Sequence, residues 1–340
     1  MEKKVQRNFL WIALLVLGTI WILARHNQVT PYQTDNGLIF GTVYKVTYQC
    51  DQNLKAEIEA ELKRFDGSLS PFNDTATITR INRNEDIVPD TFFTNVFRRS
   101  MEISRETDGA FDITVAPLAN AWGFGFKKGA FPDSLMIDSL LQITGYEKVK
   151  LENGKVVKQD PRVMLSCSAV AKGYSVDVIA RLLDRKGIKN YMVDIGGEVV
   201  VKGKNATGDL WRIGINKPYD DSLAVKQDIQ VVLNLTDLGM ATSGNYRNYY
   251  YKDGKKYAHT IDPRTGYPVQ HSILSSTVIA EDCMTADALA TSFMVMGLEE
   301  AEKFCKANPM IDAYFIYSGE NGEFKTYYTD GMKRYMPDAK

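Results

Sequence analysis

Apolar side chains recur every three or four residues in several segments of the chain, which is the spacing of one face of an α-helix. Leu54, Ile58, Leu62 and Phe65 follow this spacing, and the segment 93–104 repeats it before a glycine at position 109. Both segments are predicted to be amphipathic helices. Further helices are predicted from Ala171 to a glycine cap at Gly187, from Met284 to Met296 and from Glu299 to Ala307.

Between the predicted helices lie runs rich in β-branched and aromatic residues, which favour strands. Helical and extended segments are mixed without strict alternation. The pattern therefore predicts an α+β fold, with mixed, largely antiparallel sheets packed with helices, rather than a doubly wound fold. The predicted strands are Thr42–Tyr48, Tyr191–Val201, Leu210–Ile215, Ile229–Leu235, Ser275–Ile279 and Asp312–Tyr317.

The N-terminal part carries a membrane-targeting pattern. Residues Phe9 to Ala24 contain no charge, and more basic residues precede this segment than follow it. Its sixteen residues fall short of the roughly 20 that a spanning helix needs, so an uncleaved anchor, a cleaved signal and a buried apolar helix stay open. Tryptophans near both ends and the lack of a small-residue cleavage signature favour the anchor. We expect a membrane segment at 1–25, with the remainder outside the cytoplasm.

Residues 26–37 are polar, with one proline and one glycine, and are predicted to be a linker. No low-complexity stretch or charge block follows, so residues 38–336 are expected to form one compact domain. The 340-residue chain has 41 Lys+Arg against 42 Asp+Glu, which argues against a nucleic-acid binder held by bulk charge. Its four cysteines form no C-x-x-C pair and it has three histidines, which argues against a zinc ribbon or a histidine metal cluster.

One predicted helix carries a pair of oxygen side chains. Asp287 and Thr291 are four residues apart and so share one helix face. A carboxylate and a hydroxyl are hard ligands that suit Mg²⁺, which leaves coordination positions for water and substrate phosphates. The alternative is a solvated aspartate and a threonine bonded to its own helical turn.

Two further stretches hold candidate chemistry. In SCSAVAKGYS, small residues precede Lys172 where a helix begins, so free backbone N–H groups and an ammonium could receive an anion. In YAHTIDPRTGYP, His259 could take a proton from a hydroxyl nucleophile. A tight loop entering a helix and a histidine bonded into a turn are the plain alternatives.

Other stretches are less specific. The segment 109–126 combines Asp112 with aromatic and small residues that could form a wall for a flat ring system, although core packing explains them equally. The strings DIGG (194–197) and TSGN (242–245) are predicted to be glycine or small-residue turns. The chain contains no glycine-rich nucleotide fingerprint.

Taken in order, these stretches resemble the ApbE family of FAD:protein FMN transferases. The resemblance covers nearly all of the part after the linker. It is carried by GTVYKV (41–46), SPFNDTATITRIN (70–82), GAFDITVAPL (109–118), AWGFG (121–125), SAVAKGYSVD (168–177), YMVDIGGEV (191–199), WRIGINKP (211–218), ATSGNYRNYY (241–250), HTIDPRTGYPV (259–269) and ADALATSFMVMG (286–297).

The resemblance implies a Mg²⁺-dependent enzyme that uses FAD as substrate. FMN would pass through a phosphoester bond to a threonine hydroxyl of a target protein, and AMP would leave. It makes Asp287 and Thr291 metal ligands, together with the backbone carbonyl of Ala169. Asp287 is thereby also a catalytic candidate, and His259 is the candidate base that activates the threonine.

The resemblance also implies a set of FAD contacts: Phe40, Phe72, Ala110, Phe111, Asp112, Ser166, Lys172, and Thr260 or Ile261 in the H-x-I-D string. One departure concerns the positions before the metal loop, where the family usually has Asp-Leu and this chain has Ser166 and Cys167. Ser166 keeps a hydrogen-bonding oxygen without the carboxylate, so its contact with FAD is expected to be weaker or rearranged.

Two alternatives stay open. One is an FAD pyrophosphatase, in which water replaces the acceptor and FMN and AMP are released. The other is a membrane-tethered FAD-binding protein without catalysis, which has little need of magnesium ligands. The resemblance implies acceptors among the subunits of membrane-bound, flavin-dependent electron-transfer complexes, and a place at the bacterial inner membrane with the catalytic domain facing the periplasm.

Overall fold

The computed structural model describes residues 11, 15–19, 30–126, 131–219, 228–245, 249–252, 255–319 and 321–337, and gives only the backbone of 249–252, 255 and 256. Within these residues, no helix is long and apolar enough to cross a membrane. Most of the predicted membrane segment, including Phe9 and Ala24, lies outside the described residues.

Eight of the described strands form one sheet, in the order β1-β2-β5-β6-β9-β12-β13-β14, and every neighbouring pair is antiparallel. These strands are β1 (Tyr32–Ile39), β2 (Thr42–Gln49), β5 (Tyr191–Ile195), β6 (Glu198–Lys202), β9 (Leu238–Gly244), β12 (Ile273–Ala280), β13 (Asp312–Ser318) and β14 (Phe324–Tyr328). Two-stranded sheets are formed by β3 (Val149–Glu152) with β4 (Lys155–Lys158), β7 (Trp211–Asn216) with β8 (Ile229–Leu235), and β10 (Tyr249–Lys252) with β11 (Lys255–Ala258).

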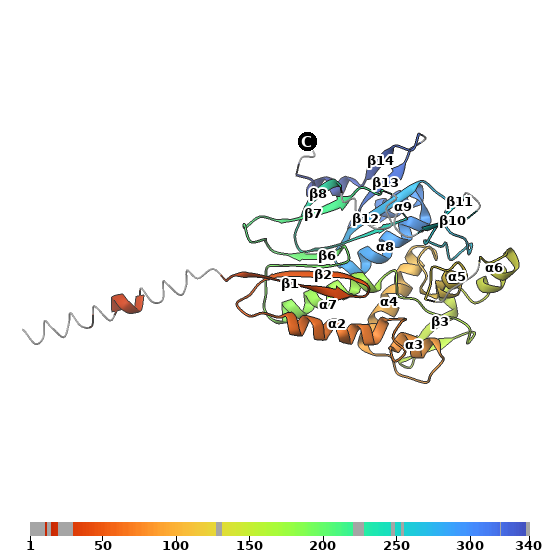
Figure 1. Ribbon diagram of the computed structural model, residues 1–340, viewed down its shortest axis with the longest axis horizontal. Coiled ribbons are helices and arrows are strands. Elements are labelled where there is room, and N and C mark those ends of the chain that lie inside the picture. The colour runs from red at the N-terminus through yellow and green to blue at the C-terminus, as the bar shows by residue number, and fades with distance from the viewer. Residues whose placement is uncertain are drawn as a thin grey trace, which may run out of the picture.

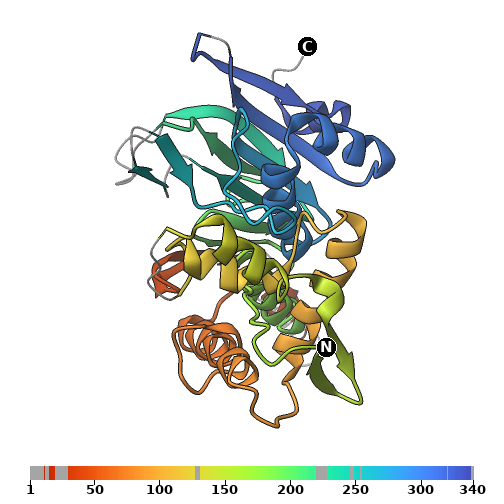
Figure 2. The same cartoon turned by 90° about the vertical axis from the view of Figure 1, so that its right-hand side faces the viewer.

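Helices cover one face of the large sheet (Figure 1). The helices of the described residues are α2 (Lys55–Leu69), α3 (Thr77–Asn82), α4 (Thr91–Glu106), α5 (Ala116–Ala121), α6 (Ser134–Leu141), α7 (Ala171–Arg185), α8 (Cys283–Met296) and α9 (Leu298–Ala307), with short 3-10 turns at Ile113–Val115, Tyr146–Lys148 and Asp330–Tyr335. Helices α7 and α8 pack on each other and on the central strands. Figure 2 shows the C-terminal strands, in blue, at one end of the molecule and the N-terminal helices, in orange, at the other.

The two faces of the sheet carry different cores, because side chains alternate along a strand. On β6, Val199 and Val201 point to an apolar cluster shared with Trp211 of β7 and Leu233 of β8. The neighbouring position Val200 packs instead against the helix-side core. The β7–β8 ribbon therefore covers the face opposite to the helices, and the α+β prediction is confirmed.

Three predicted segments differ from the structure. The expected strand Tyr191–Val201 is a hairpin, because Gly196 and Gly197 adopt positive φ angles of 67° and 99° that form a turn between β5 and β6. The expected turn TSGN lies mostly in β9, whose small side chains pack beneath α8 and pair with β12. From Tyr32 the expected linker is strand β1, since pairing with β2 requires backbone groups rather than apolar side chains.

Candidate functional site

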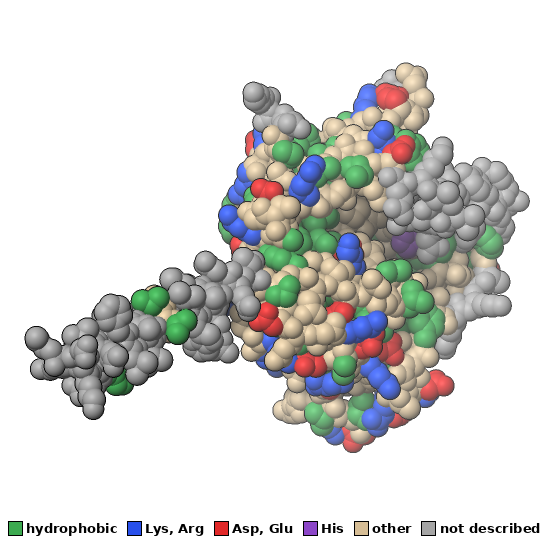
Figure 3. All heavy atoms as spheres, turned by 60° about the vertical axis from the view of Figure 1, so that its left-hand side comes forward, with side chains coloured by type: hydrophobic (Ala, Val, Ile, Leu, Met, Phe, Trp, Pro, Cys, Tyr) green, Lys and Arg blue, Asp and Glu red, His purple; other side chains and the backbone are tan. Residues whose placement is uncertain are grey.

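A cavity of about 440 Å³ lies beside the central strands β6 and β9 of the large sheet, next to helix α8. Its lining comes from six segments: 110–126, 166–172, 196–198, 242–244, 259–263 and helix α8, with Phe72 at its edge. The space-filling view shows the surface hollowed between the two halves of the molecule (Figure 3). Residues far apart in the sequence thus share one site.

Helix α8 brings Asp287 and Thr291 to the cavity wall, as their spacing predicts. The helix begins at an aspartate cap, where Asp282 Oδ1 accepts a hydrogen bond of 2.8 Å from the N–H of Thr285. Asp287 is buried, and its Oδ2 accepts a hydrogen bond of 2.9 Å from the backbone N–H of Gly173 in the first turn of α7. Burial raises the pKa of Asp287.

The two helices are joined a second time by Asp177. This carboxylate on α7 accepts hydrogen bonds of 2.9 Å from the backbone N–H groups of Cys283 and Met284, at the start of α8. These are groups that a helix leaves without internal partners. Burial raises the pKa of Asp177 to about 7. The position of Asp287 is therefore set by contacts in both directions between α7 and α8.

The chemistry of this wall fits a magnesium ion. Asp287 and Thr291 supply a carboxylate and a hydroxyl, and Ala169 lines the cavity in the loop before α7, where its carbonyl could add a third oxygen. Among the described residues, no group of three or more His, Cys, Asp or Glu side chains is arranged to hold a metal ion. One carboxylate and a few neutral oxygens would leave coordination positions of a bound Mg²⁺ for water and phosphate.

Two hydrogen bonds that the sequence analysis did not anticipate hold side chains of the site in place, and one of them involves Thr291. The hydroxyls of Ser243 on β9 and Thr291 lie 3.0 Å apart, and Thr260 donates a hydrogen bond of 2.7 Å to Oδ1 of Asn245. Both partners belong to the TSGN string, which sequence reasoning treated as a turn. No sequence pattern indicates these contacts, because they depend on the strand pairing that places β9 beneath α8.

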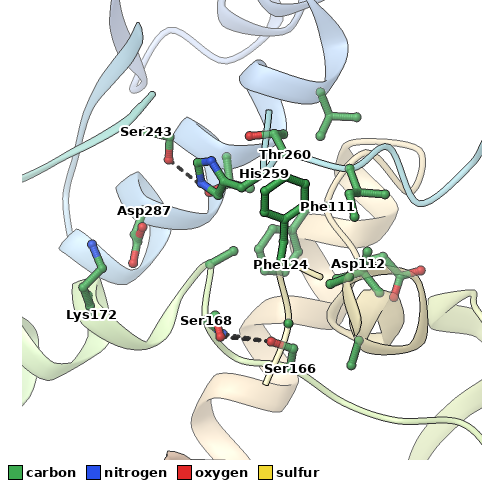
Figure 4. Close-up of a pocket in the computed structure, with 18 of the residues that line it drawn as sticks. Phe111, Asp112, Phe124, Ser166, Ser168, Lys172, Ser243, His259, Thr260 and Asp287 are labelled. Carbon is green, nitrogen blue, oxygen red and sulfur yellow. Dashed lines mark hydrogen bonds between the residues drawn. The ribbon is translucent and has the colours of Figure 1, made fainter. Parts of the chain in front are cut away.

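Lys172 lies in the first turn of α7 and points into the cavity beside Asp287 (Figure 4). Its ammonium forms an ion pair with Glu198 at the start of β6. Burial tends to lower the pKa of Lys172, but the carboxylates of Glu198 and Asp287 outweigh it and raise this pKa. Glu198 is a site residue that sequence reasoning missed. A lone carboxylate in the otherwise apolar string EVVV was its only signal.

The opposite wall is largely apolar and aromatic. Ala110, Phe111 and Phe124 line it, and Phe72 stands at its edge with 81% of its surface exposed. Asp112 also lines the cavity, while its Oδ1 accepts hydrogen bonds from the N–H and hydroxyl of Thr114 at 2.7 and 2.6 Å. Burial raises the pKa of Asp112 to about 6. A flat ring system fits between such surfaces.

The loop after β11 places His259, Thr260 and Ile261 at the cavity. The His259 ring meets the Phe124 ring edge-on, with centroids 6.4 Å apart. The loop is closed on itself by the bridge between Ile261 and Pro268. A histidine held in this way faces the same cavity as Asp287 (Figure 4), and Thr291 lines that cavity too.

Of the two remaining predicted FAD contacts, Ser166 lines the cavity and Phe40 does not. The hydroxyl of Ser166 lies 3.1 Å from that of Ser168 (Figure 4). Phe40 lies outside the cavity lining, in the turn between β1 and β2, with its ring centroid 5.5 Å from that of Phe65. The structure thus brings the predicted residues together with the exception of Phe40, and their roles stay predictions.

Comparisons with known proteins agree with this arrangement. The sequence profile of the ApbE family matches residues 40–315. The FAD:protein FMN transferase of Vibrio cholerae is 35% identical over 336 residues, covering 95% of this chain and 98% of that protein. The one from Haemophilus influenzae is also 35% identical, covering 92% and 94%. The structure of the V. cholerae flavin transferase ApbE matches with a TM-score of 0.80 at 34% identity, covering 90% of this chain and 99% of that chain.

Proposed function

The chain belongs to the ApbE family and is a flavin transferase; we propose that it moves FMN from FAD onto a threonine hydroxyl of a target protein, with Mg²⁺ bound and AMP leaving. The observation that carries this proposal is the cavity itself. It has Asp287, Thr291 and Lys172 on one side, aromatic side chains on the other and His259 between them.

Asp287, Thr291 and the carbonyl of Ala169 would hold the magnesium ion. When bound there, Mg²⁺ would offset the negative charge of the pyrophosphate and of the departing AMP. The hydrogen bonds to Gly173 and Ser243 keep the two side chains in place without the ion. Preformed ligands of this kind reduce the cost of ordering the site.

The remaining residues orient FAD and move one proton. Phe111 and Phe124 offer flat surfaces to a ring system, and the Lys172 ammonium faces the anionic part. His259 would accept the proton of the threonine hydroxyl as its oxygen bonds to the phosphorus of FMN. The bond from that phosphorus to the oxygen of AMP breaks, and AMP keeps the electron pair. His259 would then release this proton to solvent, and AMP and the modified acceptor would leave the site before the next turnover.

We further propose that the N-terminal apolar segment attaches the enzyme to the bacterial inner membrane, with the catalytic domain in the periplasm. Its acceptors would be subunits of membrane-bound, flavin-dependent electron-transfer complexes. The charge asymmetry around residues 9–24 supports this orientation. Protease treatment of intact spheroplasts should digest the catalytic domain, and protection of that domain would place it in the cytoplasm instead.

The test of the reaction uses the full-length protein in detergent, with FAD and Mg²⁺, with and without a flavin-accepting protein. Intact mass should show the acceptor heavier by one FMN, and AMP should appear in equal amount. The Asp287→Asn variant should neither add FMN to the acceptor nor release AMP. AMP release that ignores the acceptor would make the enzyme a pyrophosphatase, and FAD binding without AMP would leave a binding protein.

A further inference from the structure

Glu198 is buried in the cavity wall, with 2% of its surface exposed. It follows the turn at Gly196 and Gly197, and strand alternation places it on the same face of the sheet as Val200, toward the helices. One of its oxygens forms the ion pair with Lys172. The other, Oε2, is buried without a hydrogen-bond partner among the described residues. A buried carboxylate is costly unless it is paired, so its presence here calls for a role.

The charges of two carboxylates, Glu198 and Asp287, act on the Lys172 ammonium and raise its pKa. Within the described part of the chain, its ion pair is made with Glu198 rather than with Asp287. Asp287 is instead held by the backbone N–H of Gly173, which leaves its net charge intact. The lysine keeps 38% of its side chain exposed to the cavity while its charge is anchored at the sheet.

The pairing of Lys172 with Glu198 affects Asp287, the proposed metal ligand, because a carboxylate binds a cation best when no ammonium is paired with it. An ammonium paired with Asp287 would neutralise it, and a metal ion would have to displace that ammonium from a buried position. We propose that Glu198 is a positioning residue that holds the Lys172 ammonium away from Asp287 and so keeps Asp287 available to the metal ion. This inference rests on the proposed magnesium site at Asp287 and Thr291.

The proposal predicts coupling between two substitutions. Without Glu198, Lys172 turns to Asp287 and competes with the metal ion. Lys172→Met alone removes an ammonium that is already held by Glu198, and metal affinity should change little. Lys172→Met should therefore restore metal binding that Glu198→Gln has weakened. If Glu198 acted only through its own negative charge, or only in folding, Lys172→Met would have the same effect with or without Glu198.

The experiment measures Mn²⁺ binding to the full-length protein, from the electron paramagnetic resonance signal of free Mn²⁺. Wild type, Glu198→Gln, Lys172→Met and the double variant form the cycle, and circular dichroism checks their folding. Glu198→Gln should weaken Mn²⁺ binding by about tenfold, which is a typical loss of affinity when a residue that supports a metal ligand is replaced. Lys172→Met should reverse most of that loss, yet shift the wild-type affinity by no more than about threefold. Equal effects of Lys172→Met in the two backgrounds would overturn the proposal.

Two controls separate the possible failures. If wild type binds Mn²⁺ no more tightly than Asp287→Asn, the proposed magnesium site itself is wrong, and the role of Glu198 falls with it. If Asp287→Asn abolishes binding but the cycle shows no coupling, only the inference about Glu198 is wrong. Should Glu198→Gln not fold, Glu198→Asp replaces it, because the shorter side chain keeps the charge but withdraws it from Lys172.

Discussion

The backbone N–H of Gly173 donates a 2.9 Å hydrogen bond to Asp287, and this contact requires helices α7 and α8 to approach very closely. A Cβ atom on residue 173 would lie 2.3 Å from the carbonyl oxygen of Cys283 and 2.7 Å from Cβ of Asp287. Such distances are too short for any side chain. The glycine is therefore required for the close approach that places Asp287, the proposed metal ligand, against the first turn of α7.

Gly173→Ala should force α7 and α8 apart. Overpacking of this kind costs on the order of 3 kcal/mol, and here the obstructing atoms include backbone that cannot turn aside. We expect a lower free energy of unfolding in urea. Gly67→Ala is the matched control, because Gly67 also lies in a helix but has open space around its Cβ position. That variant should be neutral or gain up to about 1 kcal/mol.

Ser243→Ala should weaken metal binding without unfolding the protein. The substitution removes the hydroxyl 3.0 Å from that of Thr291, so the ligand loses its orientation. A drop in Mn²⁺ affinity of about tenfold is expected. The control is Ser275→Ala on the adjacent strand β12, whose buried hydroxyl has no hydrogen-bond partner in the described structure. An equal effect of the two variants would contradict the role of Ser243.

His259→Gln should slow flavin transfer while leaving FAD bound. Loss of a positioned proton acceptor lowers the rate by about 10²–10⁴-fold. FAD affinity should change by no more than a few fold, since Lys172 and the aromatic wall are untouched. Single-turnover transfer and a flavin fluorescence titration separate the two quantities. A parallel loss of FAD affinity would make His259 a binding residue instead of a base.

Asp177→Asn should change how stability depends on pH. Burial raises the pKa of Asp177 from its usual 3.8 to about 7, so the folded state holds this proton more tightly than the unfolded state does. Its contribution to the free energy of unfolding is fully present below pH 4 and is lost as pH rises toward 7, by on the order of a few kcal/mol.

The asparagine variant lacks this titration. The stability of wild type relative to Asp177→Asn should therefore decrease from pH 4.5 to pH 7.5. Urea denaturation followed by tryptophan fluorescence at four pH values in this range gives the difference directly. A constant difference across the range would mean that Asp177 does not titrate there.

Local patterns predicted the longer helices α2, α4, α7, α8 and α9, but not the short helices α3, α5 and α6, whose few residues show no clear periodicity. The helix predicted from Ala171 to Gly187 is α7, and the one from Met284 to Met296 is α8. The order of strands in the sheet could not be predicted in the same way. Strand β6 pairs with β9, and β12 lies between β9 and β13, so the neighbours are set by packing across long stretches of chain.

The candidate site shows the same contrast between features that follow from local sequence and features that depend on long-range packing. Asp287 and Thr291 could be paired from their helical spacing, and local patterns also pointed to Asp112, Lys172 and His259. The resemblance to a family supplied the remaining candidates. Glu198 and Ser243 could not be found, because their importance comes from burial and from partners in distant segments. A glutamate within a strand looks like a solvent-facing residue until the helix that covers it is known.

The cavity draws its walls from segments that extend from residue 71 to residue 295. During synthesis the chain emerges N-terminus first, so the aromatic wall is made long before helix α8. The aromatic wall and the side chains proposed to bind the metal ion can meet only after helix α8 has joined the sheet. A chain that ends before helix α8 therefore lacks one wall of the cavity.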